Sequence, residues 1–127
     1  MAKTFRQMVA EARGEVEVIP PQEAQKRAQA NALIVDVREP TDLQPLGIIP
    51  GAVNVPLGVL PIRADQELPE HMRDQRLQDR AQVVITTCGG GGQAALAAKL
   101  LKDMGFERVA MIDGGTTGWK NAGLPTE

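Results

Sequence analysis

A single cysteine, Cys88, precedes four consecutive glycines in the stretch TTCGGGGQAALAAKLL. Each glycine loses more conformational freedom on folding than any other residue and adds no side chain to a core, so four in a row indicate a turn that needs bare backbone. The stretch follows an apolar run, QVVITT, and precedes a helical pattern that begins at Gln93. We therefore expect Cys88 between the carboxyl end of a strand and the amino end of a helix, in the crevice where open α/β sheets bind ligands.

The backbone amides of such a glycine turn point inward and, with the positive end of the helix, form a concave site for an anion. An anion there would lie against the Cys88 sulfur, and the same field favours a thiolate over a thiol. Cys88 is therefore the candidate catalytic nucleophile, although a lone cysteine in mid-strand is more often a small buried apolar residue. The candidate substrate-binding groups are the amides of Gly89, Gly90, Gly91, Gly92 and Gln93.

Two alternative phosphate-binding loops fit the sequence poorly. A nucleotide-binding P-loop needs a Lys-Ser or Lys-Thr pair after its glycines, whereas Gln93 and Ala94 stand here. A cysteine phosphatase would use an arginine near the end of the loop to clamp the phosphoryl oxygens, and no arginine occurs between Cys88 and Arg108.

A dinucleotide-binding fingerprint fits better. Gly89, Gly91 and Ala94 satisfy the pattern G-x-G-x-x-A, and Asp113 follows about twenty residues later. Only fourteen residues follow Asp113, however, which is too few for the remaining strands of a full cofactor domain. The fingerprint stays a weak alternative.

The elements that must position Cys88 alternate between strand and helix patterns. Five short strands are predicted, in EVEVIPP, ALIVDV, the segment around Val53, QVVITT and ERVAMID. Helices are predicted over residues 3–13 with Gly14 as a stop, in PQEAQKRAQAN with Asn31 as a left-handed cap, from Gln93 to Gly105, and in TTGWKNAG. The stretch LPEHMRDQRLQDR reads as a surface helix or an irregular connector. This alternation predicts an α/β fold with a mainly parallel sheet and helices on both faces.

Length and composition restrict the function. The 127 residues, with 43% apolar residues, predict one compact domain. Fourteen basic against sixteen acidic residues, without a basic stripe, exclude nucleic acid as an expected partner. Neither a signal-peptide core nor a membrane span is recognisable in the sequence, and one unpaired cysteine suits a reducing compartment, so we expect a cytoplasmic protein.

Together these motifs resemble the single-domain rhodaneses, sulfurtransferases that carry sulfane sulfur as a cysteine persulfide. The resemblance rests on LIVDVREP, GIIPGAVNVPL, the CGGGGQ loop, the helix AALAAKLLKDMGF and the closing IDGGTTGWKNAGLP, all in family order. It implies one rhodanese-like domain over residues 1–127 with a five-stranded sheet, on which residues 1–14 pack as a helical extension. The family's persulfide cysteine falls on Cys88, its loop amides on Gly89 to Gln93, and its Asp-x-Arg pair on Asp36 and Arg38.

The same resemblance implies the reaction. A small sulfur donor would load Cys88, and a thiol, a cyanide-like molecule or a protein acceptor would take the sulfur, without a metal or a cofactor. Asp36 and Arg38, two apart at the end of a strand, share a face and are expected to shape the site through a salt bridge. His71 lies in a charged stretch and is not expected to act as a general base, because a thiolate already attacks without one.

The loop departs from active members of the family at two positions. They often carry arginine directly after the cysteine and at the sixth loop position, where this chain has Gly89 and Gln93. The family histidine before Ile-Pro-Gly-Ala is replaced by Ile48. We therefore expect weak use of thiosulfate, and the alternative function is a catalytically weak rhodanese-like module that binds a partner or senses oxidants.

Overall fold

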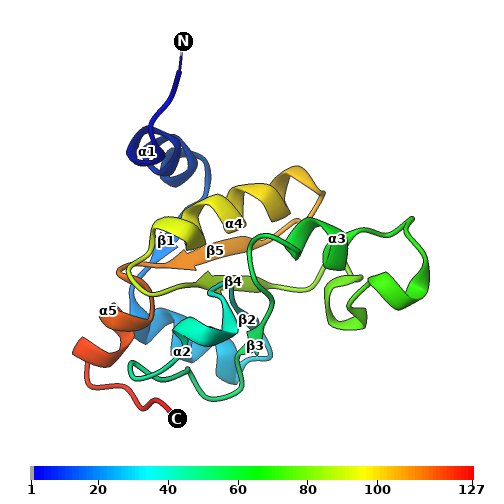
Figure 1. Cartoon of the computed structure of the whole chain (residues 1–127). Coiled ribbons are helices and arrows are strands. Elements are labelled where there is room, and N and C mark those ends of the chain that lie inside the picture. The colour runs from blue at the N-terminus through cyan, green and yellow to red at the C-terminus, as the bar shows by residue number, and fades with distance from the viewer. Residues whose placement is uncertain (1) are drawn as a thin grey trace.

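The computed structural model describes residues 2–127, which form one five-stranded sheet and five α-helices (Figure 1). The strands are β1 (Glu17–Ile19), β2 (Leu33–Asp36), β3 (Val53–Asn54), β4 (Val84–Thr87) and β5 (Val109–Ile112). The helices are α1 (Phe5–Glu15), α2 (Pro21–Gln29), α3 (Leu60–Ala64), α4 (Gly92–Asp103) and α5 (Gly115–Asn121). All paired strands run parallel in the order β1-β5-β4-β2-β3, which confirms the predicted parallel α/β sheet.

Both faces of the sheet are covered, so the central strands are apolar on both sides. Ile85 and Ala110 belong to the apolar cluster beneath α2 and α5, while their neighbours Val84 and Met111 belong to the cluster beneath α4. Trp119 on α5 is 3% exposed, and its indole nitrogen donates to the Pro125 carbonyl at 2.8 Å. Trp119 therefore packs as an aromatic anchor that ties the carboxyl-terminal segment to α5.

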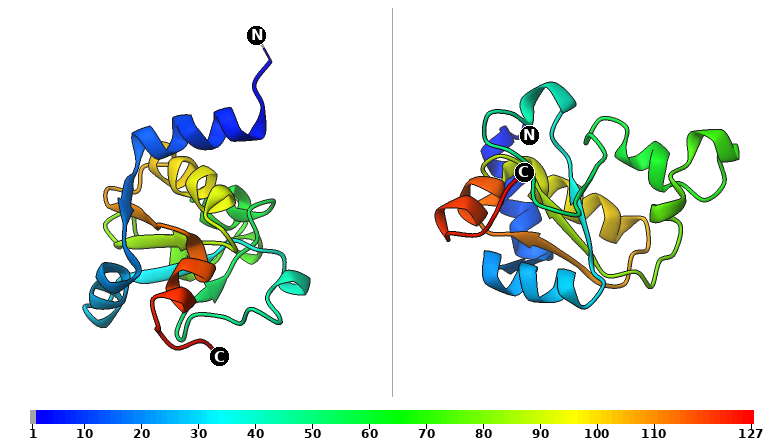
Figure 2. Two further views of the ribbon diagram at one scale, coloured as in Figure 1. Left: turned by 90° about the vertical axis from the view of Figure 1, so that its left-hand side faces the viewer. Right: turned by 90° about the horizontal axis from the view of Figure 1, so that it is seen from below.

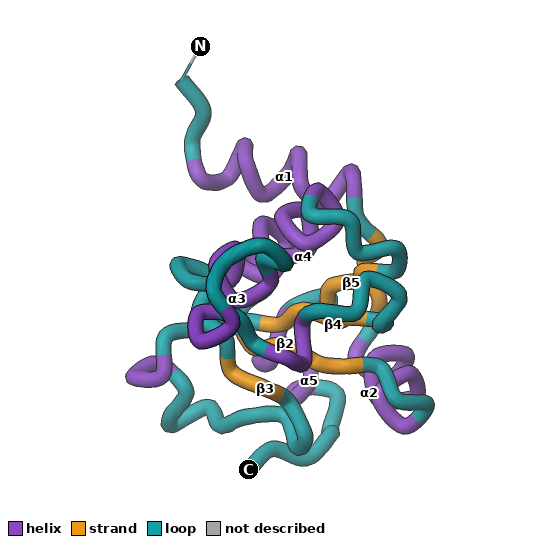
Figure 3. The backbone as a smooth tube through the Cα atoms, turned by 90° about the vertical axis from the view of Figure 1, so that its right-hand side faces the viewer, coloured by secondary structure: helices purple, strands orange, loops and turns teal. Residues whose placement is uncertain are grey.

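Helix α1 lies outside α4, on the side away from the sheet (Figures 2 and 3). A capping box between Thr4 and Gln7 starts α1 at Phe5, and Ala12 is its fully buried contact residue. The predicted bounds of 3–13 were wrong by two residues at each end, because the helix passes through Gly14 and ends at Glu15. Gly14 is exposed with no neighbour within 4 Å of a Cβ, so its cost is the modest one of about 1 kcal/mol for a helical glycine.

The other connections fit their sequence signals. Asn31 after α2 has a φ of 75°, which confirms the left-handed cap. The polar stretch between α3 and β4 is an irregular connector with two 3₁₀ turns, η2 (Glu70–Met72) and η3 (Gln75–Leu77), and a third turn, η1 (Pro40–Asp42), follows β2. Among residues 2–127, none of the helices combines the length and the apolar character needed to cross a lipid bilayer.

Candidate active site

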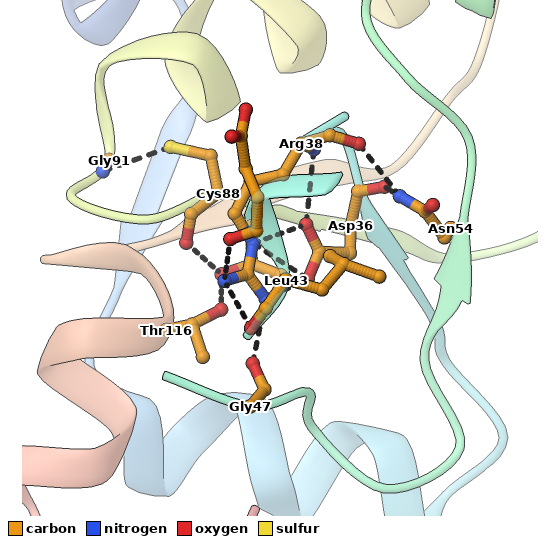
Figure 4. A network of polar contacts seen from close by, with 10 residues as sticks. Asp36, Arg38, Leu43, Gly47, Asn54, Cys88, Gly91 and Thr116 are labelled. Atoms are coloured by element: carbon orange, nitrogen blue, oxygen red, sulfur yellow. Dashed lines mark hydrogen bonds and ion pairs between the residues drawn. The ribbon is translucent and has the colours of Figure 1, made fainter. Parts of the chain in front are cut away.

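Cys88 directly follows β4, the central strand, and is 2% exposed. Its sulfur accepts hydrogen bonds from the amide of Gly91 at 3.0 Å and from the amide of Ala94 at 3.4 Å (Figure 4). Both donors belong to the loop and the first turn of α4, so the sulfur lies at the positive end of this helix. The arrangement stabilises negative charge on the sulfur, as a thiolate or a persulfide requires.

The four loop glycines meet different structural demands. Gly91 caps α4 with a φ of 110°, a conformation that favours glycine. A Cβ on Gly92 would lie 2.9 Å from the Cζ of Phe5, so Gly92 leaves room for that ring. Gly89 and Gly90 have no atom within 4 Å of a Cβ and face open space.

Several backbone amides around the sulfur are unpartnered. Within residues 2–127, the amides of Gly89, Gly90, Gly92 and Gln93 donate to no acceptor. Helix N-termini leave such groups free for water or a ligand. Four of the five amides named from the sequence are therefore free to meet a ligand, while the Gly91 amide donates to the Cys88 sulfur.

The turn at the start of α5 is hydrogen-bonded to the cysteine loop. The amide of Thr116 donates to the Cys88 carbonyl at 2.8 Å, and the amide of Thr117 donates to the Gly89 carbonyl at 3.0 Å. The hydroxyls of Thr87 and Thr116 lie 3.0 Å apart. The turn that begins α5 at Gly114 and Gly115 therefore supports the cysteine loop, a contact that the sequence did not predict.

Asp36 and Arg38 form a buried ion pair beside the loop, with 2.6 Å between Nη2 of Arg38 and Oδ2 of Asp36 (Figure 4). Arg38 Nε also donates to Asp36 Oδ1 at 3.0 Å, and Nη2 donates to the Gly47 carbonyl at 2.8 Å. Nη1 reaches the carbonyls of Asp42 and Leu43 at 3.4 Å each. The guanidinium therefore joins the end of β2 to the segment 42–47.

These elements surround an open hollow of about 480 Å³ above the sulfur. Its lining residues are Phe5, Arg38, Asp42, Leu46, Cys88, Gly89, Gly90, Gly92 and Gln93. Phe5, Asp42 and Leu46 were not predicted as site residues, because they come from segments distant in the chain and carry no local signal of a site. His71 lies in η2 and does not line the hollow, and Asp113 pairs with Arg13 at 3.3 Å.

A larger hollow of about 690 Å³ lies at the opposite, amino-terminal edge of the sheet. Two of its basic side chains have partners: Arg27 donates to Glu17 at 2.7 Å, and Lys102 Nζ donates to the Glu15 carbonyl at 2.6 Å. The hydrogen bond from Arg27 holds the pKa of Glu17 below its usual value. The smaller hollow is the candidate site, because the cysteine and the unpartnered loop amides line it.

The structure thus defines a parallel α/β domain with a cysteine loop at the carboxyl end of its central strand. The chain matches the family model for the rhodanese-like domain over residues 20–122. The chain therefore belongs to the rhodanese-like domain family. Helix α1 precedes the matched region.

One curated relative and two solved structures are similar to this chain over most of its length. A sulfurtransferase of Allochromatium vinosum is 33% identical over 95 residues, which cover 75% of this chain and 78% of that protein. The structure of a polysulfide-sulfur transferase homodimer from Wolinella succinogenes is similar with a TM-score of 0.73 and 28% identity, over 97% of this chain and 86% of that one. A Rhodopseudomonas palustris protein of unknown function, described as a possible tyrosine phosphatase, has a TM-score of 0.90 and 32% identity, over 100% of this chain and 96% of that one.

Proposed function

We propose that the chain is a sulfurtransferase that carries sulfane sulfur as a persulfide on Cys88. The observation that carries the proposal is the buried Cys88 sulfur, held by the Gly91 and Ala94 amides at the start of α4 beside four unpartnered amides. Relatives named as sulfurtransferases support the same reaction. The site-shaping role of Asp36 and Arg38 is part of the proposal, because their ion pair fixes the segment 42–47 at the hollow.

The reaction has two displacements. The Cys88 thiolate attacks the terminal sulfur of a small donor, a new S–S bond forms, and the donor's remainder leaves with the electron pair of the broken bond. A thiolate or cyanide acceptor then attacks the terminal sulfur of the persulfide, and Cys88 leaves as the thiolate. In this proposal the free amides of Gly92 and Gln93, in the first turn of α4, stabilise charge on the terminal sulfur. No metal or cofactor takes part in either step.

The acceptor is a small thiol, a cyanide-like molecule or a cysteine of another protein. Two of the residues that line the hollow, Gly90 and Gln93, are exposed to solvent. An acceptor larger than cyanide could therefore reach the hollow from this side. A single unpaired cysteine also suits a reducing compartment, and the proposal places the reaction in the cytoplasm.

Mass spectrometry after incubation with sulfane donors tests the proposal. The wild-type chain should gain one sulfur atom on Cys88, and a thiol should then remove it. Cys88→Ser should neither gain sulfur nor turn over, since a serine hydroxyl forms no persulfide. Failure of thiosulfate, polysulfide and organic donors alike to load Cys88 would refute the enzyme and leave the binding or oxidant-sensing module.

Phosphoryl transfer is a second candidate because one similar structure is described as a possible tyrosine phosphatase. The loop from Cys88 to Gln93 holds no arginine, and the Arg38 guanidinium is already bonded to Asp36 and Gly47. Hydrolysis of an aryl phosphate that depends on Cys88, without sulfur loading, would favour the phosphatase.

A further inference from the structure

Phe5 places an aromatic ring at the mouth of the cysteine site from outside the matched rhodanese-like region. A Cβ on Gly92 would lie 2.9 Å from Cζ and 3.1 Å from Cε2 of Phe5, so the ring rests directly on the glycine that begins α4. Phe5 also lines the same hollow as Cys88 and is still 55% exposed. One side of the ring therefore contacts the loop, and much of the remainder is available to a ligand.

Among the described residues that line the hollow, no basic side chain is free to bind a doubly charged donor. Among the described residues that line it, Arg38 is the one basic side chain. The Arg38 guanidinium donates to the Asp36 carboxylate and to the Gly47 carbonyl, and its Nη1 reaches two further carbonyls. Asp42 adds an exposed carboxylate to the lining, and Gln93 is neutral. Neutral amides are what remains to bind the charge of a donor.

Leu46 adds a second apolar side chain to this lining. A donor in this hollow therefore meets apolar carbon at Phe5 and Leu46, and unpartnered amides at the loop. Thiosulfate, a small dianion without an apolar group, can bind only to the loop amides. A donor with an apolar body and one charge fits both.

We infer that Phe5 makes this sulfurtransferase select sulfane-sulfur donors with an apolar organic group over thiosulfate. The inference rests on the proposed function and names its donor class: organic thiosulfonates and related organic sulfane compounds. The organic group packs on Phe5, and the terminal sulfur approaches Cys88. Aromatic donors gain most, because ring pairs add an attraction beyond the burial of apolar area.

Benzenethiosulfonate and thiosulfate are matched probes of this selection. In both, the Cys88 thiolate attacks the outer sulfur, the Cys88–S bond forms, and the bond between the outer sulfur and the oxidised sulfur breaks. Benzenesulfinate leaves with the electron pair in one case and sulfite in the other, and both steps produce the same Cys88 persulfide. The donors differ in that a phenyl group replaces one charged oxygen.

Steady-state kinetics with the two donors test the inference. Wild-type protein should have the higher kcat/KM with benzenethiosulfonate. Phe5→Ala should lower that kcat/KM about fivefold to tenfold, mainly by raising KM, and should change the value for thiosulfate less than twofold. Phe5→Leu should retain most of the preference. Met8→Ala is the matched control, because Met8 is 44% exposed on the same helix and does not line the hollow.

The outcomes separate the two proposals. If Phe5→Ala lowers both donors equally, or neither, while Cys88 still loads sulfur, Phe5 does not select the donor and the inference is overturned alone. If thiosulfate is the better wild-type donor, the inference is likewise overturned. If no donor loads Cys88 in wild-type protein, the proposed function fails and this inference fails with it.

Discussion

A Cβ atom on Gly115 would lie 2.7 Å from the carbonyl oxygen of Cys88 and 2.9 Å from that of Gly89. The backbone at the start of α5 therefore touches the backbone of the cysteine loop without a side chain between them. The amides of Thr116 and Thr117 make the same contact with hydrogen bonds to those two carbonyls. The position of the catalytic sulfur depends on this second turn as well as on its own loop.

Gly115→Ala should therefore damage stability and chemistry together. Gly115 has a φ of 61°, and the added methyl also collides with backbone atoms that have no room to move. We expect a loss of about 1–3 kcal/mol in the free energy of unfolding, measured with urea, and slower sulfur loading of Cys88. Gly123→Ala is the control, because Gly123 has a φ of 82° but no atom within 4 Å of a Cβ. Equal losses in the two variants, with normal loading in both, would contradict the contact.

The pair of Asp36 and Arg38 should be strongly coupled. Arg38→Met leaves the Asp36 carboxylate buried without its partner, and such a loss costs about 3–5 kcal/mol. Adding Asp36→Asn removes the unpaired charge. In the wild-type chain Asp36 Oδ1 accepts a hydrogen bond from the backbone amide of residue 38 at 3.1 Å, and the asparagine oxygen can still accept it. The double variant should therefore be more stable than Arg38→Met alone. Urea denaturation of all four forms measures the coupling, and additive losses would show that the charges act independently.

Asp74 should make part of the stability depend on pH. Its carboxylate accepts Arg76 Nη2 at 2.6 Å and the Arg76 amide at 2.9 Å, and the side-chain bond to Arg76 is the main cause that lowers the pKa of Asp74. A carboxyl whose pKa is lower in the folded than in the unfolded state stabilises the fold above its unfolded pKa and loses this effect as the pH falls through the folded pKa.

The difference in unfolding free energy between wild type and Asp74→Asn should therefore be complete at pH 7. It should close progressively as the pH falls from about 4, the ordinary pKa of an aspartate in the unfolded chain, through the lower pKa of Asp74 in the folded protein. Denaturation curves at a series of pH values measure it. A difference that stays constant down to the lowest pH at which both forms fold would mean that the charge of Asp74 contributes nothing.

The sheet and the position of Cys88 followed from local patterns. QVVITT is a continuous apolar run followed by glycines, so its strand, its loop and the helix after Gln93 could be placed from one contiguous stretch. The limits of α1 were predicted less well, because the capping box at Thr4 begins the helix two residues after the predicted start and the tolerated Gly14 lets it continue past the predicted end. Local pattern fixes which elements exist better than where they end.

Three residues that line the hollow could not be predicted from the sequence. Phe5, Asp42 and Leu46 lie far along the chain from Cys88 and reach the hollow only because α1 packs on α4 and Arg38 holds the segment 42–47. Likewise, the reason for Gly92 is the ring of Phe5, a tertiary contact. The spacing of these residues from Cys88 along the chain follows no pattern that would predict their contact with the site.

Gln93→Arg should convert the site toward thiosulfate. Gln93 is exposed, lines the hollow and lies in the first turn of α4, so an arginine there has room and places its guanidinium beside the donor. Charge-assisted hydrogen bonds to an oxyanion contribute about 1.5–3 kcal/mol, so kcat/KM for thiosulfate should rise roughly tenfold to a hundredfold, largely through a lower KM. A donor with an apolar body and one charge should gain far less.

Gln29→Arg is the control for net charge and should leave both donors unchanged, because Gln29 is exposed at the end of α2 and does not line the hollow. Kinetics with both donors, together with the mass of the loaded protein, give the comparison. If Gln93→Arg folds, loads sulfur on Cys88 and shows no shift toward thiosulfate, then residue 93 does not meet the donor. The donor would then bind nearer Gly89, whose Cβ direction is equally open.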